Sequence, residues 1–307
     1  VIQDEVIYTD GWGLWTDGGG SSLELKDPHS DNRSAMNWAD SDESQKAPWT
    51  AIDYTDSIDN GVETPSPMEI YAILPGDYVV DDLVMTTGAT TNFSDNFAGG
   101  AAGWSFNGCF VRSSVDAGVG YGGTAGLSVR GSERGEFMGT GTRYINQLQK
   151  NMSVVPISGQ ICRLQAKARW LRGFPFLIMG CHGYWFATPG DLTLPPNLGS
   201  PGLPNSVFTN NAGPAIADVV YAPVLPQAYS NVVLTCRVDD PDGIASVTLR
   251  YGLDPVTNYS SAAMLDGGAG VDERAGDGIF SVSLSGQASG TVAAFYIEAV
   301  DLAGVSS

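Results

Sequence analysis

The chain has 307 residues, a formal net charge of −19, and 39 glycines and 17 prolines that follow no repeat. The negative charge disfavours nucleic acid as a partner, and glycine without a period excludes a collagen-like helix. A hydrophobic fraction of 43 % excludes a disordered chain and is enough for the cores of two or three domains.

The first segment, residues 1–46, predicts a strand over residues 1–8, a loop over residues 11–20 and a short strand over residues 21–25. The stretches DEVIYTD (residues 4–10) and DGGGSSLELKDPHSDNRSAMNWADSDE (residues 17–43) resemble the closing half of a bacterial lamin-tail domain, an immunoglobulin-like sandwich. The resemblance implies an open sheet, because only the later strands of that domain are here. Residues 5–9 would then dock onto the chain, stay disordered, or pair with a second copy as a homo-oligomer. We expect docking or pairing, because Trp12, Trp15 and Trp38 are costly to leave in water.

Short apolar runs separated by Gly-rich loops fill residues 47–188 and predict a jelly-roll sandwich. The clearest run, ICRLQAKARWLR (residues 161–172), alternates apolar residues with Arg163, Gln165, Lys167 and Arg169. Since successive side chains of a strand point to opposite faces, one face of this strand should be dry and the other wet. We expect a long hairpin between it and the apolar run at residues 176–186. The other strands are expected over residues 49–54, 68–74, 78–85, 104–115, 127–131 and 143–150.

Two stretches of this middle segment carry a second resemblance. DYVVDDLVM (residues 77–85) and NFSDNFAGGAAGW (residues 92–104) resemble carbohydrate-binding jelly rolls. Where that family often has an acidic pair that binds a structural calcium, this chain has Asn96 and Ala98, which argues against calcium there.

A Pro/Gly-rich stretch, residues 189–212, predicts a linker, and residues 213–307 predict an immunoglobulin-like or fibronectin-like sandwich. Inward rows are expected within residues 232–238, 247–251, 280–284 and 293–299, the last being Ala293, Phe295, Ile297 and Ala299. DDPDG (residues 239–243) and LDGGAGVDERAGDG (residues 265–278) resemble loops of the Ig-like modules that follow lamin-tail domains.

Together the resemblances imply an all-β, modular member of the secreted multidomain proteins of bacterial cell surfaces. Some of those proteins carry a CotH-like kinase, whose Gly-rich loop, HRD and DFG motifs do not occur in this sequence. The start at Val1, without Met or a signal peptide, suggests a processed product or a fragment. The longest apolar run, residues 174–187, is too short to cross a bilayer, so no membrane insertion is expected.

Catalysis is not expected, because only His29 and His182 occur and neither a GxSxG nor an HExxH motif is present. The four cysteines contain no CxxC pair, which argues against zinc. Two interpretations stay open for them: buried free thiols, or one disulfide between Cys162 and Cys181 across the expected hairpin.

Two candidate sites follow from polar residues. If the strand RYINQLQK shares a sheet with residues 161–172, the two would expose a platform that suits sugar hydroxyls and anionic groups, with Tyr184 or Trp185 as stacking candidates. The alternative is that this face is solvated, or covered by an acidic neighbouring domain. The members of the expected platform are Arg143, Gln147, Gln149, Arg163, Gln165, Lys167 and Arg169.

The second candidate is a calcium site in the acidic loops of the last domain. The alternative there is ordinary turn formation by Asp-Gly pairs. The residues are Asp239, Asp242, Asp266, Asp272 and Asp277.

We therefore expect a non-catalytic, extracellular protein that requires no cofactor and binds polysaccharide or other surface proteins. The alternative is a structural subunit of a surface assembly or filament, built by packing of strands and domains between chains.

Overall fold

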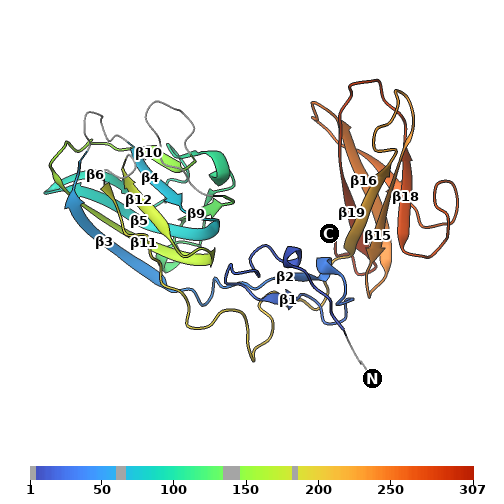
Figure 1. Ribbon diagram of the computed structural model, residues 1–307, viewed down its shortest axis with the longest axis horizontal. Helices are drawn as coiled ribbons and strands as arrows, with labels where there is room; N and C mark the ends of the chain where they lie inside the picture. Colours follow the sequence, from blue (N-terminus) through green and yellow to red (C-terminus); the bar gives the residue numbers. More distant parts are fainter. Residues whose placement is uncertain (1–4, 60–66, 134–145, 182–185) are drawn as a thin grey trace. The chain divides into compact units, whose positions relative to one another are not determined.

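The computed structural model describes residues 5–59, 67–133, 146–181 and 186–307. The protein is all-β, and its chain divides into two compact units (Figure 1). The large unit comprises Leu14–Ser22 and Ser41–Ser206. The C-terminal unit comprises Leu23–Asp40 and Val207–Ser307, together with the described residues up to Gly13.

The large unit contains two antiparallel sheets. The six-stranded sheet has the order β3 (Trp49–Ser57), β11 (Ile161–Gly173), β5 (Gly76–Thr87), β9 (Gly126–Gly131) and β8 (Ser114–Asp116), with β6 (Thr90–Asp95) also paired to β5. The five-stranded sheet has the order β13 (Phe186–Ala187), β12 (Leu177–Cys181), β4 (Pro67–Ala72), β10 (Leu148–Asn151) and β7 (Ser105–Phe106).

The alternation predicted for residues 161–172 is confirmed by burial along β11. Its apolar positions, such as Leu164 and Trp170, are buried, whereas Arg163 and Gln165 are exposed. The buried row shares one core with residues of the other sheet, among them Ile70 and Met179. The unit is therefore sandwich-like, with one core for both sheets.

The hairpin expected from β11 to residues 176–186 is wrong. Strand β11 pairs with β3 and β5, whereas β12 pairs with β4 and β13, so the chain passes from one sheet to the other between them. Gly173 makes this passage possible with a φ of +82°, a conformation that L side chains rarely adopt. Cys162 and Cys181 therefore belong to different sheets, and both are free thiols rather than a disulfide.

Two other expected strands differ from the structure. Residues 104–115 are broken by a turn at Gly108, where φ is +60°, and give β7, a 3-10 turn η3 (Gly108–Phe110) and β8. Residues 5–9 form no strand, and residues 1–4 lie outside the described part. The elements of the first forty residues are η1 (Asp10–Trp12), β1 (Leu23–Leu25), η2 (Ala35–Asn37) and β2 (Trp38–Asp40), with β1 paired to β2.

The C-terminal unit contains two three-stranded sheets. One has the order β14 (Ala215–Ala222), β15 (Val232–Asp239), β18 (Ile279–Leu284), and the other β17 (Ser260–Met264), β16 (Ile244–Leu253), β19 (Ala293–Asp301). Their inward rows meet in a second core that includes Leu234, Leu249 and Ala299. Among the described residues, no helix is long and apolar enough to cross a membrane.

Candidate functional site

The polar row of β11 lies on the outer face of the six-stranded sheet, beside residues of β3. In the register of this pair, Gln165 stands opposite Asp53, Lys167 opposite Ala51 and Arg169 opposite Trp49. The wet face predicted from sequence therefore includes residues that the alternation of one strand could not reveal.

Asp53 neutralises the first part of this row. Its carboxylate accepts a hydrogen bond from Arg163 Nε at 2.7 Å, a second from the Arg163 guanidinium, and one from Gln165 Nε2 at 3.3 Å. The hydrogen bond from Arg163 is the main cause that lowers the pKa of Asp53 below its ordinary value. Arg163 and Gln165 are thus already engaged.

The second part of the row contacts aromatic rings instead of carboxylates. Lys167 Nζ lies 5.0 Å from the centre of the Tyr121 ring, and Arg169 Cζ lies 5.2 Å from that of Trp49. The two rings meet edge to face at 5.6 Å and 90°. We call these four residues, Trp49, Tyr121, Lys167 and Arg169, the basic–aromatic face. Such cation–aromatic contacts are worth about 0.5–1 kcal/mol at exposed sites.

A buried carboxylate holds Tyr121 in place. Asp81 of β5 accepts hydrogen bonds from the Tyr121 N–H and from Thr124 Oγ1, both at 2.8 Å. These bonds fix the short turn η4 (Tyr121–Gly123) against the sheet, and Tyr121 is 45 % exposed. The aromatic surface is therefore both positioned and open to solvent.

The cations of this face keep their charge for a ligand. Within the described ranges, neither Lys167 nor Arg169 forms an ion pair with a carboxylate. Burial lowers the pKa of Arg169, an effect that the charge of Asp42 partly offsets. Its buried Nε has no hydrogen-bond partner among the described residues. A guanidinium stays protonated even so.

The platform expected from two neighbouring strands does not form. Strand β10, with Gln149, lies in the five-stranded sheet, and Gln147 beside it is fully buried. Gln147 Nε2 lies 3.5 Å from Gln149 Oε1, so the two amides contact each other. Arg143, Tyr184 and Trp185 lie outside the described residues.

Sequence reasoning missed the two aromatic residues of the basic–aromatic face. Trp49 could be recognised in the sequence as the start of a strand, but nothing in the Gly-rich loop around Tyr121 indicated a binding residue.

The acidic loops of the C-terminal unit bring some of the predicted calcium ligands together. Asp266, Asp272 and Asp277 place carboxylate oxygens within 4.8 Å of one another. Their oxygens also accept backbone N–H groups: Asp266 those of residues 276–278, Asp272 that of Arg274 at 3.3 Å. The geometry therefore suits both a cation and ordinary turns.

A second cluster combines one predicted residue with two others. Asp242 lies with Asp240 and Asp301, whereas Asp239 belongs to neither cluster. Burial raises the pKa of Asp240, and the charges of Asp301, Asp242 and Asp239 add to this effect.

Of the two histidines, only His29 lies in the part of the chain that the structure describes. His29 Nδ1 lies 3.0 Å from Asp27 Oδ1, and the same oxygen accepts the His29 N–H at 2.8 Å, as in a hydrogen-bonded turn. His182 lies outside the described residues.

No family model matches this chain, and a search of curated proteins finds no significant match.

Proposed function

We propose that this protein is non-catalytic and binds an acidic polysaccharide through the basic–aromatic face of its large unit. The observation that carries the proposal is the pair of cations, Lys167 and Arg169, that lie over the rings of Tyr121 and Trp49 and form no ion pair with any carboxylate of the described residues. In a chain of net charge −19, two cations that form no ion pair with a described carboxylate, beside an exposed tyrosine, are unusual.

The chemistry of the face matches such a ligand. Aromatic rings pack against the apolar faces of sugar rings, and ammonium and guanidinium groups bind carboxylate or sulfate substituents. Arg163 is less available, because Asp53 already holds it in two hydrogen bonds. The bacterial cell surface as location, and surface polysaccharide as partner, follow from the resemblances and belong to the same proposal.

Retention on an immobilised acidic polysaccharide tests the site. We expect Lys167→Ser and Tyr121→Ala each to weaken binding about tenfold, the equivalent of about 1.4 kcal/mol. Arg163→Ser is the matched control, since it removes a charge from the same strand face that Asp53 already neutralises. Equal losses for Arg163→Ser and Lys167→Ser would indicate unspecific charge attraction, and unchanged retention for Lys167→Ser and Tyr121→Ala would refute the site.

A further inference from the structure

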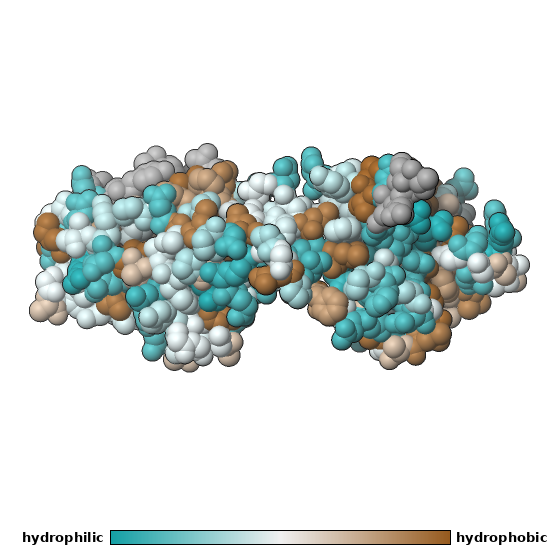
Figure 2. All heavy atoms as spheres, turned by 90° about the horizontal axis from the view of Figure 1, so that it is seen from below, coloured by the Kyte–Doolittle hydropathy of each residue, from teal (hydrophilic) through white to brown (hydrophobic). Residues whose placement is uncertain are grey.

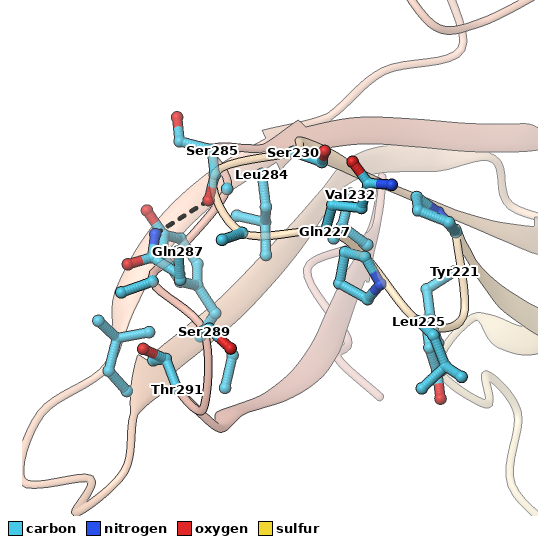
Figure 3. A pocket seen from close by; sticks show the side chains of 18 of the residues that line it. Tyr221, Leu225, Gln227, Ser230, Val232, Leu284, Ser285, Gln287, Ser289 and Thr291 are labelled. Carbon is cyan, nitrogen blue, oxygen red and sulfur yellow. Dashed lines mark hydrogen bonds between the residues drawn. The ribbon is translucent and has the colours of Figure 1, made fainter.

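The core of the C-terminal unit is closed at one end and open at the other. At the open end lies a cavity of about 470 Å³ between the two three-stranded sheets (Figure 3). Among the residues that the structure describes, no charged side chain lines it. Around the hollow, Figure 3 shows Leu225 and Gln227 on one loop, Gln287, Ser289 and Thr291 on another, and Leu284 at the end of β18.

The burial of the inward-facing residues of β19 shows where the core opens. Ala299 is fully buried, whereas Phe295, four residues earlier on the same face, is 37 % exposed and lines the cavity. Its ring meets that of Tyr221 on β14 at 6.3 Å, edge to face. The edges of β14 and β19 therefore approach each other across the opening, and apolar side chains between them are only partly covered.

The outer edge of β19, which faces away from β16, is already paired over a short length. Residues 305–307 turn back onto it: Ser307 N–H donates to Ala299 O at 3.0 Å, Ala299 N–H to Ser307 O at 3.2 Å, and Asp301 N–H to Val305 O at 3.0 Å. Because every second residue of a strand directs its N–H to the same side, Ile297, Phe295 and Ala293 direct theirs to this edge as well. Among the described residues no strand pairs there, since β19 ends its sheet.

We propose that this edge and cavity accept an added strand, residues 5–9 of a second copy of the chain. This segment belongs to no described sheet, and its Ile7 and Tyr8 are 75 % and 68 % exposed. Its centre, Val6-Ile7-Tyr8, is uncharged like the cavity, and alternation would place Val6 and Tyr8 on one face. The segment would extend about 17 Å and the free stretch of β19 from Ala293 to Glu298 about 20 Å, at 3.4 Å per residue.

The net charge of the chain favours an uncharged contact, such as that with residues 5–9, over one that relies on ion pairs. Two copies of a chain with net charge −19 repel each other, so contact is cheapest where both surfaces are uncharged. Main-chain hydrogen bonds then provide the affinity, and the apolar side chains fix the register. Repeated head-to-tail, the contact makes the chain a subunit of an assembly, whether or not it binds polysaccharide.

Sedimentation velocity of the full chain over a range of concentrations tests the proposal, without sugar. We expect association that increases with concentration, and a monomer after deletion of residues 1–9. A capped peptide of residues 5–10, EVIYTD, should bind the deletion variant. Phe295→Asp in that variant should weaken the peptide at least about tenfold, because it places a carboxylate in an uncharged cavity. Tyr296→Asp, the neighbour on the outer face of β19, is the matched control and should bind as before.

Each other result overturns the inference. A full chain that stays monomeric at every concentration excludes the second copy, even if hydrogen exchange shows residues 5–9 protected within the chain. Association that survives the deletion belongs to another surface. Equal effects of Phe295→Asp and Tyr296→Asp, both folded by circular dichroism, would mean that the peptide does not use the cavity.

Discussion

At the scale of single residues, Gly173 stands at one connection between the two sheets of the large unit, the one from β11 to β12. Its φ of +82° is left-handed, and a Cβ there would lie 2.4 Å from Gly76 Cα and 2.5 Å from Pro75 O. Gly159 has the same φ of +82° with open space around it. We expect Gly159→Ala to cost about 1 kcal/mol of unfolding free energy, and Gly173→Ala about 3 kcal/mol, because backbone must also move. Urea unfolding measures both, and equal losses would contradict the crowding at Gly173.

Asp95 makes the stability of the large unit depend on pH in the acid range. Burial alone would raise its pKa, but hydrogen bonds from Lys150 Nζ at 2.7 Å, Trp104 Nε1 at 2.9 Å and the Phe97 N–H at 2.8 Å outweigh burial and lower it. The Lys150 ammonium is thus the positively charged partner of the Asp95 carboxylate.

The lowered pKa sets the direction of the effect. Stability from Asp95 is fully present above the ordinary pKa of 3.8 and is lost as pH falls through the lower folded value. We expect wild type to lose stability more steeply below pH 4 than Asp95→Asn does, although the variant is the less stable of the two at pH 6. Urea unfolding at several pH values measures this, and parallel curves would show that Asp95 is not responsible.

At the scale of elements, the sequence predicted the strands that obey a simple period. Strand β11 was expected from the run at residues 161–172 and covers Ile161–Gly173, because its alternation of apolar and polar residues can be recognised without knowing its neighbours. The partners of a strand are set by long-range packing, which the period does not contain. For that reason the expected hairpin was wrong, and the buried Gln147 was taken for a surface residue.

The site shows the same limit. The row Lys167 and Arg169 was predicted from β11 alone, whereas the rings that complete it come from β3 and from a turn. Tyr121 reaches the face only because buried Asp81 holds its turn through hydrogen bonds from residues about forty positions away. Pairing over that distance leaves no local signal in a sequence.

The loop between β17 and β18 supports a prediction about calcium. Asp266, Asp272 and Asp277 hold like charges within 4.8 Å, which a divalent cation would relieve. If calcium binds only the folded loop, millimolar calcium should raise the melting temperature of the C-terminal unit by a few degrees above that in chelator. Asp277→Asn should remove the increase. The same melting temperature with calcium and with chelator would leave these carboxylates as turn residues.

At the scale of the whole molecule, the first forty residues are shared between the two units. Trp15 belongs to the large unit, where it is buried and the Arg172 guanidinium lies 5.9 Å from its ring. Trp38 belongs to the C-terminal unit, where its ring meets that of Trp12 at 6.3 Å and its Nε1 donates to Asn32 O at 2.9 Å. The first forty residues thus contribute to both units.

This division predicts that the two tryptophans stabilise different units. Trp15→Ala should cost the large unit about 3 kcal/mol or more, the usual loss for a buried tryptophan. Trp38→Ala should cost the C-terminal unit less, because Trp38 is only partly buried. Hydrogen exchange followed by mass spectrometry separates the two. Trp15→Ala should speed exchange in β11 and leave β16 unchanged, and Trp38→Ala should do the reverse, because local stability follows the unit to which a residue belongs. If either variant speeds exchange in both strands to the same degree, the chain unfolds as one cooperative body and the division into units does not hold in solution.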